Sequence, residues 1–130
     1  MRALALPLLL AVPLAGCSAS FDAAQVRACR LAIPALNPGT RIEVERSGPG
    51  PRRGILRIVY TVEEPSRPLR RRTIDCVFAG DGGSLPRGAL AGVASDGIPM
   101  AEASFLLLRR FYLEDRAEPP VDPGPPRTGK

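Results

Sequence analysis

Histidine and tryptophan are both missing from this chain of 130 residues, and aromatic residues make up only 5% of it. Without histidine, the chain lacks the side chain that most often serves as a general base or a metal ligand near neutral pH. With so few rings, its core must be built mainly from Leu, Ile, Val and Ala. The shortage of aromatic side chains also argues against nucleic-acid binding, which usually combines basic groups with stacking rings.

The sequence also contains no hydrophobic run long enough to cross a membrane. The longest run, from Ala3 to Leu14, is interrupted by Pro7 and Pro13 and falls short of the roughly 20 residues that a bilayer core requires. It follows a positively charged start and precedes two small residues. This arrangement predicts a signal peptide over residues 1–16, not a transmembrane helix.

The end of this segment, Leu14-Ala15-Gly16-Cys17, resembles the lipobox of bacterial lipoproteins. The resemblance covers only the export segment. It implies that the Cys17 thiol receives a diacylglycerol, that a peptidase cuts before Cys17, and that the new amino group is often acylated, with fatty chains such as palmitate. Because each buried methylene contributes about 0.8 kcal/mol, two or three chains would anchor the protein durably. Ser18 follows the cysteine where an aspartate would favour the inner membrane, so the resemblance favours the periplasmic side of the outer membrane.

If Cys17 carries lipid, Cys29 and Cys76 remain as an even pair in an oxidising compartment. We predict a disulfide between them, which would stabilise the domain by about 4 kcal/mol because it closes a loop of roughly fifty residues. A redox or metal site is the competing interpretation, but the sequence has no C-x-x-C motif and no histidine to complete a ligand set. We therefore expect no metal and no cofactor.

Hydrophobic periodicity predicts a small α+β domain over residues 17–116. Its elements are a helix over 21–36 capped by Ser20 or Asp22, strands over 41–46, 54–62 and 69–79, a weaker strand over 89–94, and a helix from Pro99 to about Leu113. The sheet would be antiparallel, with three or four strands and both helices packed on it. Alternation puts Cys76 on one face with Ile74 and Phe78, and helical spacing puts Cys29 with Val26 and Ile33, so both cysteines should point inward.

The last segment, residues 117–130, is rich in proline and almost free of core-forming residues. This composition predicts an extended, disordered tail.

Candidate catalytic groups do not form a convincing site. Glu63 and Glu64 are adjacent in a predicted turn, where they are interpreted as solvated residues. The serines have no histidine partner, and the glycines of 80–83 do not belong to a phosphate-binding motif. We therefore expect the protein not to be an enzyme.

After cleavage the chain would carry 17 basic and 13 acidic residues, a mild excess that suits anionic lipid or an acidic partner. Its one basic run is Arg70, Arg71 and Arg72, interpreted either as a partner-binding surface or as a charged sheet edge that prevents aggregation; we favour the second. The apolar surface from Phe105 to Phe111 is interpreted as core.

The leading hypothesis is a non-enzymatic lipoprotein, anchored in the cell envelope, that acts as an accessory or scaffold subunit for another envelope protein. An alternative is a small-ligand or lipid carrier with a groove between helices and sheet. An enzyme with an unfamiliar site is the third.

Overall fold

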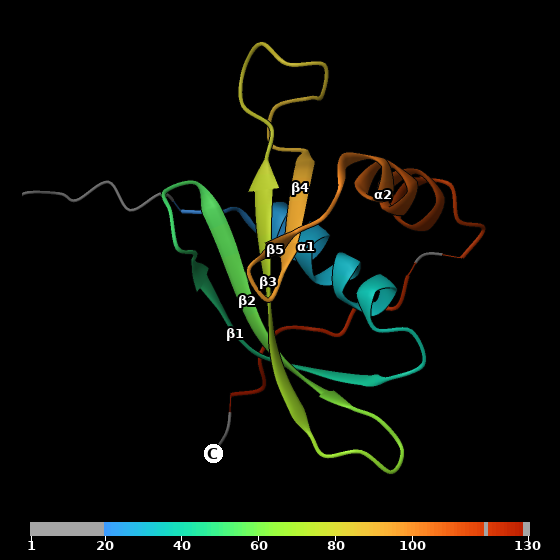
Figure 1. The fold of residues 1–130 in the computed structure, drawn as a ribbon. Helices are drawn as coiled ribbons and strands as arrows, with labels where there is room; N and C mark the ends of the chain where they lie inside the picture. The colour runs from blue at the N-terminus through green and yellow to red at the C-terminus, as the bar shows by residue number, and fades with distance from the viewer. Residues whose placement is uncertain (1–19, 119, 129–130) are drawn as a thin grey trace, which may run out of the picture.

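The computed structural model describes residues 20–118 and 120–128. The predicted signal peptide and Cys17 lie outside these residues. The elements follow the chain in the order α1 (Ala23–Leu36), β1 (Arg41–Pro49), β2 (Ile55–Glu63), β3 (Arg70–Phe78), β4 (Leu90–Ser95), β5 (Ile98–Pro99), α2 (Glu102–Leu107) and the π-helix η1 (Leu108–Glu114). The five strands form one antiparallel sheet in sequence order (Figure 1). The predicted α+β class is confirmed, with one short strand more than expected.

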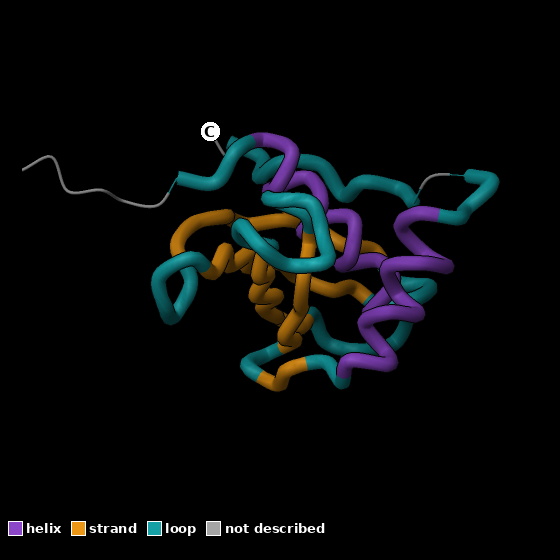
Figure 2. Tube along the Cα trace, turned by 90° about the horizontal axis from the view of Figure 1, so that it is seen from above, coloured by secondary structure: helices purple, strands orange, loops and turns teal. Residues whose placement is uncertain are grey.

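The fold has two layers, a sheet and the helices that cover one of its faces. Figure 2 shows the helices gathered on one side of the strands. Phe105 of α2 and Leu108 of η1 join the same core as α1 and the sheet. The opposite face of the sheet has no helix packed on it within the described residues.

Helix α1 begins where its sequence provides a cap. The Asp22 carboxylate accepts a hydrogen bond from the Gln25 backbone N–H, and the Gln25 side chain accepts one from the Asp22 N–H, at 2.8 and 3.1 Å. This reciprocal capping satisfies N–H groups that the first turn would otherwise leave unpaired. At the other end, Pro34 lies inside the last turn and the helix continues to Leu36.

Strands β2 and β3 bury their inward-facing residues, and Val59 and Asp75 on the other face are buried as well. Leu56, Ile58, Tyr60 and Val62 of β2 are all buried in the core, together with Ile74 and Cys76 of β3. Strand β1 extends beyond the predicted Arg46 to Pro49, after an irregularity in its register between Val44 and Arg46. Proline is tolerated there because β1 is at the sheet edge, where one side of the strand needs no partner.

The chain between β4 and α2 differs from the prediction. Asp96 and Gly97 both have positive φ and form a tight turn between β4 and β5, so the chain folds back on β4 before the helix begins. Pro99 was predicted as the first helical residue and instead belongs to this second edge strand, where its missing N–H costs nothing. Helix α2 starts at Glu102 and changes into η1 at Leu108.

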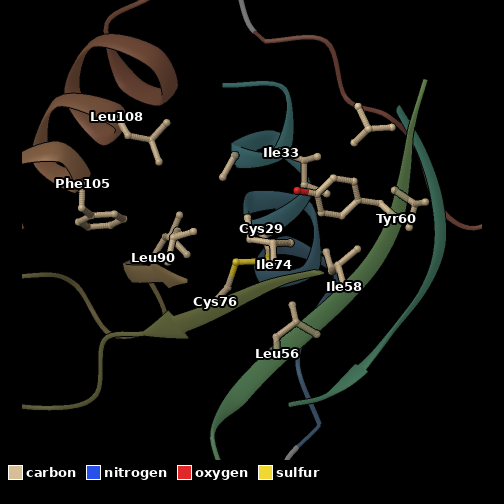
Figure 3. Close-up of a cluster of buried hydrophobic side chains, with 14 residues drawn as sticks. Cys29, Ile33, Leu56, Ile58, Tyr60, Ile74, Cys76, Leu90, Phe105 and Leu108 are labelled. Carbon is tan, nitrogen blue, oxygen red and sulfur yellow. A yellow bond between two sulfur atoms is a disulfide. The ribbon is translucent and has the colours of Figure 1, made fainter. Parts of the chain in front are cut away.

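The core lies between the sheet and the helices (Figure 3). Its largest fully buried side chains are Tyr60, Ile33, Leu56, Ile58, Ile74, Val62, Cys29 and Cys76. Aliphatic side chains dominate it, as the composition predicts.

The proline-rich tail has no helix or strand, but its described part lies against α1 and does not simply extend into solvent as predicted. Asp122 accepts hydrogen bonds from Nε and Nη2 of Arg30, both at 3.0 Å, and lies 3.7 Å from Nε of Arg27. The Gly124 N–H donates to the same carboxylate at 2.9 Å, and Pro120 is buried. The tail thus packs on α1 through one acidic residue, without needing an apolar core of its own.

Candidate functional site

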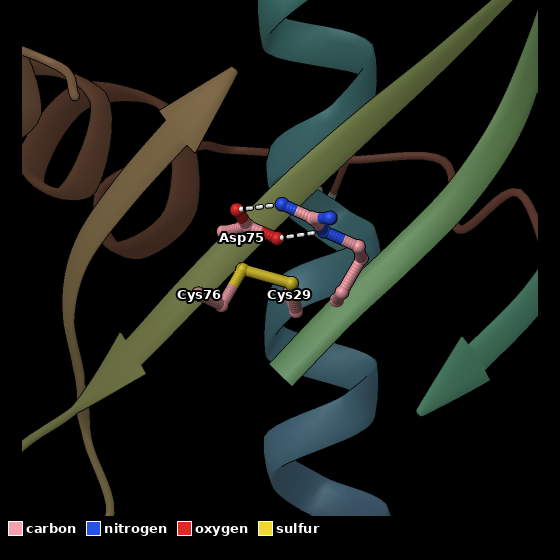
Figure 4. Close-up of a disulfide and its surroundings, with 4 residues drawn as sticks. Cys29, Asp75 and Cys76 are labelled. Atoms are coloured by element: carbon pink, nitrogen blue, oxygen red, sulfur yellow. Dashed lines mark hydrogen bonds and ion pairs between the residues drawn. A yellow bond between two sulfur atoms is a disulfide. The ribbon is translucent and has the colours of Figure 1, made fainter. Parts of the chain in front are cut away.

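The predicted disulfide is present and lies at the centre of the fold. Cys29 of α1 and Cys76 of β3 are bonded, with their Cα atoms 5.9 Å apart and neither residue exposed (Figure 4). The bond joins the first helix to the middle strand of the sheet. Because both sulfurs are buried and oxidised, they serve as a structural bridge and not as ligands.

An ion pair on the opposite face of β3 was missed by the sequence analysis. Asp75, next to Cys76, accepts two hydrogen bonds from Arg57 of β2, both at 2.7 Å. The two residues are directly opposite in the β2–β3 register, and their side chains are only 7% and 34% exposed. The hydrogen bonds with Asp75 also raise the pKa of Arg57, whose guanidinium is charged at neutral pH in any environment. The sequence alone does not identify Arg57 as this partner, because cross-strand partners follow only from register.

The run Arg70, Arg71 and Arg72 lies at a local edge of the sheet. Residues 70–73 pair with β2, while pairing of β3 with β4 begins only at Ile74. Arg70 contacts Glu64 at 2.9 Å and Arg71 contacts Glu45 at 2.7 Å. The charges that the sequence offers to a partner are therefore already engaged within the fold.

Arg72 has a different environment, because it is the centre of a partly buried polar network. It donates to the side chains of Asn37 at 2.6 Å, Asp96 at 2.8 Å and Ser95 at 2.9 Å. The Asn37 amide in turn donates to the Tyr60 hydroxyl at 3.2 Å. The network ties the end of α1 to three strands and to the β4–β5 turn.

The charges of this network are set by competing effects. Burial raises the pKa of the Tyr60 hydroxyl, and the hydrogen bond from Asn37 only partly counteracts it. Burial would also raise the pKa of Asp96, but the Thr73 N–H and Arg72 stabilise its carboxylate and leave the pKa below its ordinary value. Tyr60 is therefore neutral and Asp96 charged near neutral pH, which suits a structural network better than proton transfer.

The chain leaves the described fold beside a surface groove. Ser20, Phe21 and Val26 line one side of it, and the β1–β2 connection from Ser47 to Leu56 lines the other; its volume is about 670 Å³. The tip of this connection contains Arg52 and Arg53, both exposed. Ser20, the first residue that the structure describes, therefore lies at this groove.

The predicted core segment from Phe105 to Phe111 is divided between core and surface. Phe105 and Leu108 are buried, whereas Leu106, Leu107 and Phe111 are 45%, 59% and 63% exposed. The prediction is correct for two residues and wrong for three. Helix periodicity explains the split, because α2 and η1 can turn only one stripe toward the sheet. We call Leu106, Leu107 and Phe111 the α2 apolar surface.

The remaining candidate residues have structural contacts. Glu64 pairs with Arg67 and Arg70, and Glu63 lies 3.9 Å from Arg41. No group of three or more potential metal ligands occurs within residues 20–118 and 120–128. In the same described part of the chain, no helix is both long and apolar enough to cross a membrane.

The space between helices and sheet, where a carrier would need its groove, is filled by the core side chains. Three hollows of the described structure are open at its surface, and one of about 360 Å³ is lined by Val121 of the tail, Pro34 and Tyr112.

Comparison of the chain with protein-family models, with curated proteins and with solved structures gives no match.

Proposed function

We propose that this protein is a non-enzymatic lipoprotein of the bacterial cell envelope, anchored through lipid on Cys17, which acts as an accessory or scaffold subunit for another envelope protein. The lipobox-like Leu14-Ala15-Gly16-Cys17 provides the anchor. The outer membrane is the favoured location because Ser18 follows the cysteine.

The observation that carries the proposal is the buried Cys29–Cys76 disulfide. Structural disulfides form and persist in oxidising compartments and are rare in the cytosol. The bridge uses both cysteines that lipidation would leave, so the cysteine usage suits an exported lipoprotein. The bridge supports export without depending on the lipobox resemblance.

The accessory role is supported by the α2 apolar surface. Its three large apolar side chains are exposed over one short stretch of α2 and η1, while Phe105 and Leu108 of the same stretch are buried in the core. Contiguous exposed apolar groups on a small domain often mark contacts with another protein. A carrier is less favoured, because side chains fill the space between the helices and the sheet.

The anchor is tested by expressing the full chain and measuring its intact mass in the membrane fraction. We expect cleavage before Cys17 and an added mass of diacylglycerol with fatty acyl groups. Cys17→Ser should block both lipid addition and lipoprotein cleavage. Lipid labelling that survives Cys17→Ser would contradict the assignment.

The accessory role is tested in the same preparations, after the envelope is solubilised in detergent. The wild-type protein should co-purify with one envelope protein in fixed ratio. Leu107→Glu should lose that protein, whereas Leu69→Glu, which adds the same charge at another exposed leucine, should retain it. A monomer that carries co-eluting lipid and no protein would support the carrier instead.

A further inference from the structure

The point where the anchor joins the domain is fixed by an aromatic contact. Phe21 packs against Phe78 at the end of β3, with ring centroids 5.8 Å apart. Cys17 is three residues before Ser20, and an extended chain spans at most about 3.6 Å per residue. Lipid on Cys17 would therefore hold Ser20 within about 11 Å of the anchoring point, and the Phe21–Phe78 contact keeps this end of the sheet beside it.

The β1–β2 connection lies at this same end. Its residues face Ser20 and Phe21 across the groove of about 670 Å³, and Figure 1 shows it beside the start of the described chain. The tip of the connection, residues 50–54, contains Arg52 and Arg53. We call these two exposed arginines the basic tip.

The basic tip differs from the arginines at the other end of the sheet. Within the described residues, neither Arg52 nor Arg53 lies within 4.0 Å of a carboxylate oxygen. At the far end, Arg41 is paired with Glu63, and Arg67 with Glu64. The anchor end of the sheet therefore presents positive charge that the fold itself does not neutralise.

Acidic residues near the anchor end are already engaged. Asp22 accepts the Gln25 N–H at the start of α1, and Asp81 lies 3.7 Å from Arg87. The Arg87 contact offsets the charge of Asp81, and the single negative charge that Asp22 keeps cannot offset both Arg52 and Arg53, so the anchor end keeps a net positive charge.

The tip is also held in one conformation. The Gly50 N–H donates to the Ile55 carbonyl at 2.7 Å, and the Ile55 N–H donates to the Arg52 carbonyl at 3.2 Å. A Cβ on Gly50 would lie 2.7 Å from the Ile55 side chain, so only glycine allows this close approach. The arginines are therefore presented by a closed turn, which lowers the entropy lost on binding.

We propose that the basic tip binds the headgroups of anionic phospholipids in the membrane that holds the anchor, and so orients the domain. The inference rests on the proposed lipid anchor, which brings the tip to the bilayer. An arginine near an anionic membrane contributes about 1 kcal/mol, so two arginines favour the docked orientation by roughly thirtyfold. The far end of the sheet then points away from the bilayer.

The absence of tryptophan provides a direct test. Pro51→Trp places a single fluorophore on the exposed tip, and Pro65→Trp places one on the exposed β2–β3 connection at the far end. Each lipidated protein is reconstituted into vesicles that contain a headgroup-attached nitroxide quencher. The vesicles are phosphatidylcholine alone or phosphatidylcholine with one part in three of phosphatidylglycerol. We expect phosphatidylglycerol to increase quenching at least twofold for Pro51→Trp and to leave Pro65→Trp unchanged.

Arginine substitutions made in the Pro51→Trp background provide matched controls. Arg52→Ser with Arg53→Ser should reduce quenching to the level seen in pure phosphatidylcholine. Arg41→Ser with Arg67→Ser removes the same charge at the far end and should leave the phosphatidylglycerol effect intact.

The outcomes separate this inference from the proposed function. A lipidated, membrane-bound protein whose tip quenching is independent of phosphatidylglycerol, or of Arg52 and Arg53, would overturn the inference and leave the anchor standing. A chain whose intact mass shows no lipid would overturn both.

Discussion

Asp75 and its neighbour Cys76 show how alternation along a strand gives adjacent residues different roles. Cys76 points into the core and is bonded to α1, while Asp75 points to the other face and pairs with Arg57. Exposed ion pairs usually contribute no more than about 1 kcal/mol, because water solvates and screens both charges. Asp75 is largely shielded from water, so its pairing should matter more to stability.

Asp75→Asn should lower the free energy of unfolding by about 1–3 kcal/mol. The substitution keeps the shape of the side chain but removes its charge and one of the acceptors that Arg57 uses. The guanidinium, which is only 34% exposed, would then be left without its charged partner. Urea denaturation followed by circular dichroism measures the change.

Glu45→Gln is the matched control, because Glu45 also pairs with an arginine of β3. In that pair the side chains of Glu45 and Arg71 are 32% and 59% exposed. Its loss should cost less than about 1 kcal/mol. Equal costs for the two substitutions would mean that shielding of Asp75 adds nothing to its pairing.

At the scale of elements, the sequence predicts what depends on local pattern. The alternation of β3 correctly places Ile74 and Cys76 on the buried face, and Asp22 is one of the two predicted caps of α1. Strand register is not local, so the sequence could not pair Arg57 with Asp75. The two-residue strand β5 is too short to show a period.

The candidate site also contains features that the sequence predicts and features that it does not reveal. Pairing of Cys29 with Cys76 followed from cysteine count and face assignment, and the structure confirms it. Glu45, the partner of Arg71, lies on another strand, and Glu64, the partner of Arg70, lies across the β2–β3 connection, so no pattern in the run itself reveals either residue. The division of the α2 apolar surface from the core depends on how far the helix is rotated against the sheet, which composition does not specify.

The tail is an element whose order depends on one carboxylate. Asp122→Asn should weaken its attachment to α1 by about 1 kcal/mol, because the paired hydrogen bonds with the Arg30 guanidinium lose their charge. The heteronuclear NOE of the Val121 and Gly124 amides should fall, as expected for faster local motion. Glu118→Gln removes a charge from the same tail at an exposed residue with no ion pair in the described structure, and it should leave those values unchanged.

Acid should release the tail in the same way. The hydrogen bonds from Arg30 lower the pKa of Asp122 below its ordinary value of 3.8, against the opposing effect of burial. A carboxylate with a lowered pKa in the fold stabilises it fully above the ordinary value, and this contribution is lost as the pH falls through the lowered pKa. The NOE values should therefore stay constant from neutral pH down to about 5 and fall only below about 4. A fall already near pH 6 would exclude Asp122 as the responsible group.

At the scale of the whole molecule, stability depends on joining α1 to a sheet that is otherwise built from sequential hairpins. Each strand pairs with its neighbour in sequence, so the sheet has mostly short connections. Helix α1 precedes all the strands, and its connection to β3 is the disulfide, across a separation of 47 residues. This bond therefore closes a long loop between α1 and the middle of the sheet. A cross-link that closes a long loop removes more conformational entropy from the unfolded chain than one that closes a short loop.

Loss of the disulfide should lower the free energy of unfolding by about 4 kcal/mol, a large part of the roughly 5–15 kcal/mol typical of small domains. Cys29→Ala with Cys76→Ala should show this loss in urea denaturation at pH 7. Reductant should destabilise the wild-type protein by a similar amount, provided that it is added to the unfolded chain, because the bond is fully buried in the fold. The double variant should not respond to reductant. A wild-type protein that loses less than about 1 kcal/mol on reduction would show that packing of α1, and not the bridge, holds the helix on the sheet.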